Sequence, residues 1–328
     1  MSGAGAFPSY PGGGGGEHGF RDLLRWQLQR LRHGRAPAPP AAAWPIVASD
    51  LARGALPPGE CRITWVGHAT FLIQLAGANV LTDPVWSPRA SPIPWTGPER
   101  LVPPVPAFDE LPPIDVVLLS HDHYDHLDRP TVVRLHARFG GRLTWVTPLG
   151  YAGWLGRLGV TRVAELGWWQ TASFRSGHVC TALPARHWTR RVPWDTQHRH
   201  WASYALAAPD GTRIYFCGDS GYAPLFGEIG TRAGPFDAAL LPIGAYEPRW
   251  FMHAAHMNPE EAVQAWVDLG ARGVFIPMHW GTFRLTDEPP LEPPARLRTA
   301  WSDRRLPPGA LRILRHGETI RLGKTLSA

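Results

Sequence analysis

Short runs of apolar and β-branched residues recur along the chain and predict strands with helices between them. Three runs near the start, Arg62–Val66, Phe71–Leu75 and Asn79–Thr82, are separated by short turn sequences and predict an antiparallel meander. Pro130–Phe139 predicts a helix with proline at its first position, where the backbone N–H is not needed. The stretch 258–270 predicts another helix, because Asn, Pro and two Glu form a typical helix start before a run that ends at glycine. The alternation of strands and helices favours an α/β fold.

The highest density of possible metal-binding side chains in the sequence directly follows a predicted buried strand. Ile114–Leu119 is short and apolar, as core strands are. The six residues 121–126 then hold five side chains that could bind metal, namely His121, Asp122, His123, Asp125 and His126. Loops at the carboxyl ends of core strands often carry the sites of α/β proteins. This spacing suits two adjacent metal ions, with Asp122 expected to point to water between the two histidines; the alternative is a solvated loop rich in His and Asp.

Three later strands are each predicted to end near a histidine or an aspartate. The runs Val179–Leu183, Arg213–Cys217 and Gly273–Met278 are followed by His187, Asp219 and His279. We predict that His121, His123 and His187 hold one metal ion, that Asp125, His126 and His279 hold the other, and that Asp219 bridges the two. Such ligands suit zinc, and iron or manganese would also be accepted. Two metals about 3.5–4 Å apart form a clamp that hydrolyses phosphate and related esters.

The order of these motifs resembles the metallo-β-lactamase superfamily. The chain has an HxHxDH loop, a later histidine, an aspartate in a Gly-Asp-Ser-Gly-Tyr turn and a last histidine. Longer stretches resemble one branch, the N-acyl-phosphatidylethanolamine-hydrolysing phospholipases D. They include Trp65–Thr70, Leu111–Asp115, Pro242–Met252 and His279–Phe283, and the third of these is the most specific. The similarity covers the chain from about residue 60 to about residue 320.

This resemblance implies a fold, a cofactor and a reaction. The fold is a four-layer αβ/βα sandwich with the metals at one edge between two β-sheets. The cofactor is a pair of Zn²⁺ ions with a bridging hydroxide, and Asp125 and Asp219 are the catalytic residues. The reaction is cleavage of a membrane phospholipid, N-acyl-phosphatidylethanolamine, to N-acylethanolamine and phosphatidic acid.

Several other side chains are candidates for supporting roles. Asp83 is expected to orient a metal-bound histidine or to form a turn before the proline that follows. His68 is expected to line the site or to be held by backbone groups. His256 and Tyr124 are candidate substrate contacts, although the alanine before His256 departs from the polar residue typical of the family. His200 lies in a loop rich in Arg and Trp and is expected on the surface.

Composition agrees with a soluble metal enzyme. The chain has 328 residues, of which 44% are hydrophobic, so it can bury a large core. No linker interrupts residues 60–320, which favours one catalytic domain over residues 60–328. Its three cysteines match no metal or disulfide spacing and are expected to be buried in a reducing compartment. The first residues do not resemble a signal peptide, and no apolar run is long enough to span a bilayer. We therefore expect a cytoplasmic enzyme.

Residues 1–59 differ from the rest and predict a flexible extension with one helix. Gly12–Gly16 and Ala36–Ala43 are low-complexity stretches, and between them residues 20–32 place leucines at a helical period among arginines. This basic amphipathic helix is expected either to lie on an anionic membrane or to pack its apolar stripe on the body of the domain. The net charge of +6 is compatible with a phospholipid substrate and with peripheral binding to the inner face of the membrane.

Rival functions stay open at this stage. A lactone or ester hydrolase would use the same metals on a carbonyl carbon. A nuclease would need an added basic arm, and the sequence has only scattered arginines, so no nucleic-acid partner is expected. A membrane-surface binding protein without activity is disfavoured, because all seven ligand positions are filled. The oligomeric state is left open, with a homodimer as one form.

Overall fold

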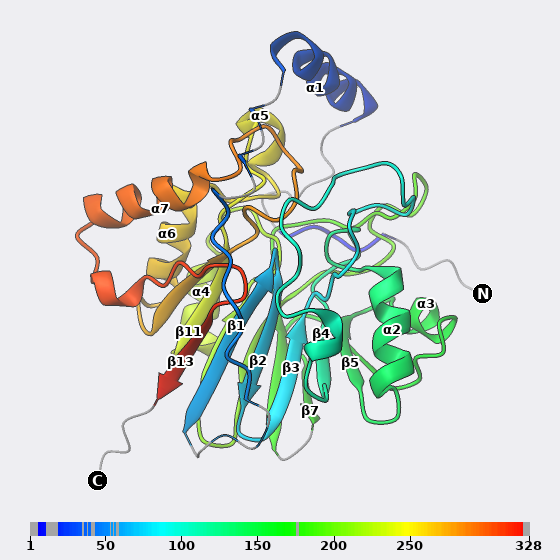
Figure 1. The fold of residues 1–328 in the computed structure, drawn as a ribbon, viewed down its shortest axis with the longest axis vertical. Coiled ribbons are helices and arrows are strands. Elements are labelled where there is room, and N and C mark those ends of the chain that lie inside the picture. The colour runs from blue at the N-terminus through cyan, green and yellow to red at the C-terminus, as the bar shows by residue number, and fades with distance from the viewer. Residues whose placement is uncertain are drawn as a thin grey trace.

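The computed structural model shows an α/β body built around two facing β-sheets (Figure 1). It describes residues 6–10, 19–34, 36–37, 39–40, 43–52, 54, 56, 59–174 and 177–323. The glycine run at 12–16, which was predicted to be flexible, lies outside the described residues. Residues 38, 41 and 42 of the alanine-proline stretch lie outside them as well.

Within the described part of the chain, the first sheet has seven strands in the order β13–β1–β2–β3–β4–β5–β6. Their bounds are β1 Glu60–Gly67, β2 Thr70–Leu75, β3 Ala78–Thr82, β4 Val116–Leu118, β5 Thr144–Pro148, β6 Val163–Leu166 and β13 Thr319–Gly323. β1, β2 and β3 pair antiparallel, which confirms the predicted meander. β3, β4, β5 and β6 pair parallel, so β4 carries its following loop to the same edge as its neighbours.

The second sheet, over the same described residues, has six strands in the order β12–β11–β10–β9–β8–β7. Their bounds are β7 Thr171–Phe174, β8 His178–Leu183, β9 Ser203–Ala207, β10 Arg213–Phe216, β11 Ala238–Pro242 and β12 Val274–Met278. β7 to β10 form an antiparallel series, whereas β10, β11 and β12 are parallel. β8, β10 and β12 are the three strands predicted from the later apolar runs.

Helices cover the outer face of each sheet. The helices are α1 Phe20–His33, α2 Arg129–Phe139, α3 Ala152–Gly156, α4 Leu225–Ala233, α5 Arg249–Met252, α6 Pro259–Asp268 and α7 Glu292–Asp303. Figure 1 shows α2 and α3 on one side of the molecule and α4, α6 and α7 on the other. Leu135 of α2 packs in one cluster with Leu81 and Trp145 of the first sheet, while Ile73 joins Tyr215 and Leu240 between the sheets. The predicted four-layer sandwich is therefore confirmed.

Local signals set the helix starts as predicted. Asn258 accepts a hydrogen bond from the Glu261 backbone N–H at 2.8 Å, and Glu261 accepts one in return from the Asn258 N–H at 3.0 Å. This reciprocal cap satisfies two N–H groups that the first turn of α6 leaves without partners. Cys61, Cys180 and Cys217 are buried, as expected for small apolar residues. None of the described helices is both long and apolar enough to cross a bilayer.

The α1 helix contacts the body through a different face from the one expected. Trp26 is buried, stacks on Phe251 at 5.0 Å and donates its indole N–H to Asp287. Arg30 pairs with Asp287 at 2.6 Å and donates to the Leu285 carbonyl at 2.9 Å. The leucine stripe does not pack on the domain, because the exposed residues of α1 include Leu23, Leu24, Leu28 and Leu31, the last at 83%.

Candidate metal centre

The seven predicted ligands come from four loops that meet at one edge of the two sheets. Four of them lie on the loop between β4 and α2 of the first sheet: His121, His123, Asp125 and His126. The other three follow β8, β10 and β12 of the second sheet: His187, Asp219 and His279. Residues more than 150 positions apart in sequence are therefore brought into contact range, as the spacing predicted.

His121, His123 and His187 form the first group of donors. The His121 Nε2 atom lies 2.9 Å from His123 Nδ1, and His187 Nε2 lies 3.2 Å from the same atom. His121 and His187 are buried, and His123 is partly so. One ring nitrogen of each histidine thus faces a common point, which is the arrangement expected for three imidazole ligands of one metal.

Asp125, His126 and His279 form the second group. The Nε2 atoms of His126 and His279 are 3.3 Å apart, and each lies 3.4 Å from Asp125 Oδ2. His68 joins this group at ligand distance, because its Nε2 lies 2.8 Å from the same Asp125 oxygen. The three residues predicted for the second metal site therefore form a compact group, and His68 contacts this group through Asp125 Oδ2.

Asp219 lies between the two groups. Its Oδ2 atom is 3.2 Å from His126 Nε2 and 3.8 Å from His121 Nε2, while its Oδ1 is 3.1 Å from His279 Nε2. The carboxylate is almost fully buried. One side chain thus reaches nitrogens of both groups, as a bridging ligand must.

The hydrogen bonds on the far side of the rings show that the donors fit metal ions. The Nδ1 of His187 lies 3.0 Å from the Ala255 carbonyl, which can only accept, so this nitrogen carries the proton. The His126 Nδ1 donates to the Asp83 carboxylate at 2.6 Å. Ser120 Oγ donates to Asp83 and so accepts from the His121 Nδ1 at 2.9 Å. The Nε2 lone pairs of these three rings therefore point into the site, where cations would separate them.

The charges of the site favour the same conclusion. Burial lowers the pKa of His121 and of His187 well below the usual value, so both rings stay neutral, as metal ligands are. Burial alone would raise the pKa of Asp219, but His126 and His279 hold that pKa well below its usual range. Burial also opposes protonation of His279, yet Asp219 and Asp125 raise its pKa to about 9. Buried carboxylates thus demand positive charge at this point, which divalent metals would supply.

Asp83 makes the contact predicted for an orienting residue. Its Oδ1 accepts the Ser120 backbone N–H at 2.7 Å, and its Oδ2 accepts both the Ser120 hydroxyl and the His126 ring N–H. One buried carboxylate therefore fixes a histidine of each group, His126 directly and His121 through Ser120. The sequence reasoning overlooked Ser120, whose only signal was its position directly before the first ligand.

His68 is held both by its ring and by its backbone. Burial, reinforced by His279, lowers the pKa of His68 to about 3, so the neutral ring donates its Nε2 hydrogen to Asp125. Its backbone N–H donates to Thr282 Oγ1, and its carbonyl accepts the His279 N–H at 3.0 Å. His68 therefore both lies at the site, through its ring, and is held by a backbone hydrogen bond, so the two alternatives considered for it do not exclude each other.

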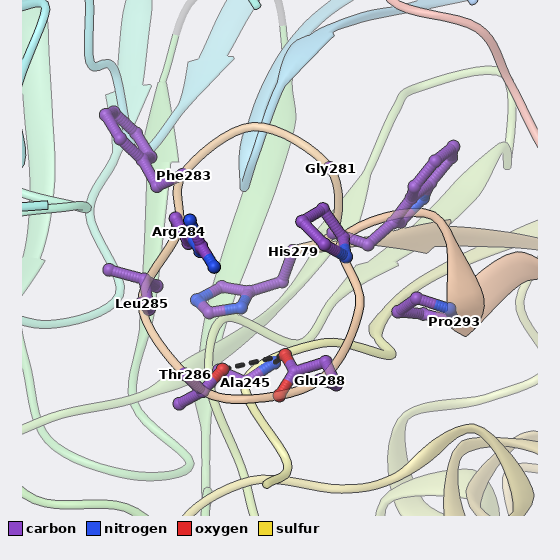
Figure 2. A pocket seen from close by; sticks show the side chains of 11 residues that line it. Ala245, His279, Gly281, Phe283, Arg284, Leu285, Thr286, Glu288 and Pro293 are labelled. Atoms are coloured by element: carbon purple, nitrogen blue, oxygen red, sulfur yellow. Dashed lines mark hydrogen bonds between the residues drawn. The ribbon is translucent and has the colours of Figure 1, made fainter. Parts of the chain in front are cut away.

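The loop after His279 folds back around this ligand (Figure 2). Glu288 accepts hydrogen bonds from the Thr286 hydroxyl and from the backbone N–H groups of Ala245 and Glu247. Burial raises the pKa of this carboxyl group. The specific motif Pro242–Met252 is thus joined to the loop that carries a predicted ligand, and a cavity of about 20 Å³ remains beside His279.

The two candidate substrate contacts are placed differently. His256 faces the site: its Nδ1 is buried without a hydrogen-bond partner and lies 3.8 Å from Asp219 Oδ2, and burial lowers its pKa to about 4. The Tyr124 hydroxyl instead donates to the Arg191 carbonyl at 2.7 Å. Only the ring of Tyr124 is left to line a neighbouring pocket of about 520 Å³.

Two expectations about surface residues are wrong. Asp122 does not point to water, because it is fully buried and pairs with Arg199 at 2.8 Å. His200 is also buried, with its ring 4.8 Å from Phe7 and 4.6 Å from Trp168. In both cases the partner comes from a distant or irregular segment that periodicity does not reveal. The one sequence signal for the contact between Asp122 and Arg199 was the richness in arginine of the loop that follows His187.

The fold and the ligand geometry define a metallo-hydrolase. A family model described as the beta-lactamase superfamily domain matches residues 78–280, which is more than half of the chain. The chain belongs to the metallo-β-lactamase superfamily, and it is a metal-dependent hydrolase of that superfamily.

Similar proteins come from bacteria, animals and archaea. An uncharacterised protein of Mycobacterium tuberculosis is 43% identical over 85% of this chain and 73% of its own length. N-acyl-phosphatidylethanolamine-hydrolyzing phospholipase D 1 of Caenorhabditis elegans is 42% identical over 72% of this chain and 68% of its own length. The structure of a metallo hydrolase from Ignicoccus hospitalis superposes with a TM-score of 0.59 at 20% identity, covering 81% of this chain and 100% of that one. This last likeness shows the fold alone.

Replacing the bridging carboxylate tests the two-group arrangement. We expect the native protein, purified without chelator, to hold about two metal ions per chain. The Asp219→Asn variant should abolish hydrolytic turnover and lower metal content while keeping its circular dichroism spectrum. Elemental analysis and thermal unfolding check both points. A fully active native enzyme with one metal ion per chain would contradict the binuclear arrangement.

Replacing Asp83 tests the orienting hydrogen bonds. In Asp83→Asn an amide nitrogen, which cannot accept hydrogen bonds, replaces one of the two carboxylate oxygens that receive them from Ser120 and His126, so we expect metal affinity to fall roughly 10–100-fold. Competition with a chelator measures this loss. Asp115→Asn is the matched control, because Asp115 is another buried aspartate beside β4, where it accepts the Asn79 N–H. Equal metal affinities in the two variants would show that Asp83 serves the fold only.

Proposed function

We propose that this chain is a binuclear phosphodiesterase of the phospholipase D type. Its substrate is N-acyl-phosphatidylethanolamine, and its products are N-acylethanolamine and phosphatidic acid. The observation that carries the proposal is the two-group ligand geometry joined by Asp219, found in a chain 42% identical to a Caenorhabditis elegans protein named for this reaction. Zinc is the proposed metal because the donors are imidazole nitrogens and carboxylate oxygens.

The chain's own residues have defined tasks in this proposal. Two bound metal ions would activate water and neutralise the phosphate oxygens. Asp219 is placed to share its carboxylate between both groups, and Asp125 receives the His68 hydrogen bond that fixes its orientation. His256 presents an unpartnered Nδ1 3.8 Å from Asp219 Oδ2, and in this proposal it contacts a phosphate oxygen or the departing ethanolamide oxygen. These groups hold the phosphodiester against the attacking water.

A pocket beside the site suits part of a lipid. It adjoins the metal loop at Tyr124 and combines apolar walls, such as Trp154 and Val192, with arginines including Arg89 and Arg129. Apolar surface accommodates hydrocarbon, and arginine attracts the phosphate end of an anionic lipid. In this proposal Tyr124 contacts the substrate through its ring.

Because the proposed substrate is a membrane phospholipid, the enzyme must reach a lipid surface. The exposed leucines of α1 lie among the exposed arginines Arg21, Arg25 and Arg32, while Trp26 and Arg30 hold the helix to the body. Apolar side chains that enter the headgroup region and cations that attract anionic headgroups act together in such helices. In this proposal the enzyme is cytoplasmic and binds peripherally to the inner face of the membrane, and the exposed face of α1 supports the membrane contact.

The position of bond cleavage separates this reaction from carbonyl hydrolysis. We expect water to attack phosphorus, so hydrolysis in oxygen-18 water should place the label in phosphatidic acid. Mass spectrometry of both products measures it. Label in a carboxylate, with a lactone or carboxylic ester as the better substrate, would instead assign the chain to the ester and lactone hydrolases.

The leucine face of α1 is tested without disturbing its attachment. The Leu24→Ser, Leu28→Ser, Leu31→Ser variant should sediment less with vesicles containing phosphatidylglycerol and lose activity on them, because burial of apolar surface is removed. Activity on a soluble short-chain phosphodiester should stay at the native level. Val133→Ser is the control, since Val133 is an exposed apolar residue of α2. Unchanged vesicle binding in the triple variant would refute the role of this helix.

A further inference from the structure

Asp122 lies between two predicted ligands of the first group but faces away from the metal site. Its carboxylate is 0% exposed and accepts two hydrogen bonds from the loop that carries His187. The Arg190 backbone N–H donates to Oδ1 at 3.0 Å, and the Arg199 guanidinium donates to Oδ2 at 2.8 Å. The residue therefore joins the metal loop of the first sheet to a loop of the second sheet.

Neighbouring groups extend the same junction. Arg191 donates from one guanidinium nitrogen to the Asp122 carbonyl at 2.6 Å and to the Leu127 carbonyl at 2.8 Å. Asp195 accepts the backbone N–H of Arg191 and also pairs with Arg199 at 3.0 Å, so it braces the loop internally. Among the described residues, the hydrogen bonds and ion pairs of Asp195 stay within its own loop, whereas Asp122 belongs to the metal loop.

We propose that Asp122 is a positioning residue that sets the geometry of the first donor group. This inference rests on the proposed binuclear site. His121 and His123 flank Asp122 in sequence, and His187 lies on the loop that Asp122 holds, so this carboxylate ties the segment that carries two donors to the loop that carries the third. Because the Asp122 carboxylate is fully buried, water cannot replace the Arg199 and Arg190 groups that hold it, and removal of the carboxylate would release the contact between the two loops.

The second donor group is held by other contacts. His126 is fixed by Asp83, and His279 lies on a loop tied down through Glu288. Loss of Asp122 should therefore weaken the binding of the metal ion at the first group and leave the binding at the second group unchanged. A residue that only stabilised the fold would affect both ions alike, so the selectivity distinguishes positioning from general stability.

The test is a titration of the metal-free full chain with cobalt(II), followed by absorption and by competition with a chelator. Asp122→Ala should bind one of the two ions roughly 10–100-fold more weakly than the native chain. Its binding curve should resemble that of His187→Ala and differ from that of His279→Ala, which mark loss of the first and second groups. Asp122→Asn, which keeps an oxygen for the Arg190 N–H, should show a smaller loss and guards against misfolding of the alanine variant.

Asp195→Asn is the matched control, because it also loses a contact to Arg199 but leaves the junction between the loops intact. It should bind both ions as the native chain does. The inference is overturned if the native chain binds two ions while Asp122→Ala weakens both equally or neither, or if Asp195→Asn reproduces its effect. A native chain that binds a single cobalt ion would overturn the binuclear function itself, and the selective role with it.

Discussion

The carboxylate of Asp219 is buried between two groups of imidazoles, and the surrounding structure is organised by the need to balance that arrangement. Its oxygens lie 3.1–3.2 Å from the Nε2 atoms of His279 and His126, at the edge where the loops of the two sheets meet. Converging lone pairs and buried carboxylates repel one another unless cations lie between them. The hydrogen bonds of Asp83, Ser120 and the Ala255 carbonyl fix which ring nitrogen faces inward, and so they define the site.

The side chains of the site can meet only if the loops that carry them approach closely, and two glycines permit this approach. At Gly218, just before Asp219, an added Cβ would lie 2.5 Å from the Ser120 Cβ, and the residue has a φ of +60°. At Gly244 an added Cβ would lie 2.0 Å from the His279 carbonyl oxygen. A larger residue at Gly218 would push this second-sheet loop away from the metal loop of the first sheet, and one at Gly244 would push apart the loops that follow β11 and β12. The close backbone contact between layers is therefore as much a part of the site as the ligands.

The sequence predicted the elements and the gathering of the ligands better than it predicted their supports. Strand and helix signals are local, so the meander, the Asn258 cap and the strand ends before His187, Asp219 and His279 all lie where periodicity placed them. The metal-binding roles of these residues stay predictions. Asp122 was misplaced because its partner Arg199 is 77 residues away, in a loop without periodicity. Long-range ion pairs of this kind leave no pattern in a single sequence.

The attachment of α1 to the body shows the same limit. The leucine period correctly predicted a helix, but its orientation depends on Trp26 and Arg30 meeting Asp287, a contact that spans more than 250 residues. Asp287 is adjacent to Glu288, which holds the backbone of the Pro242–Met252 motif, and both lie on the loop that begins at His279. The contact that attaches α1 therefore lies on the same loop, residues 279–291, as a predicted metal ligand. In the proposed function, a lipid surface bound by the leucines of α1 would therefore be connected through Asp287 to the loop that carries this ligand.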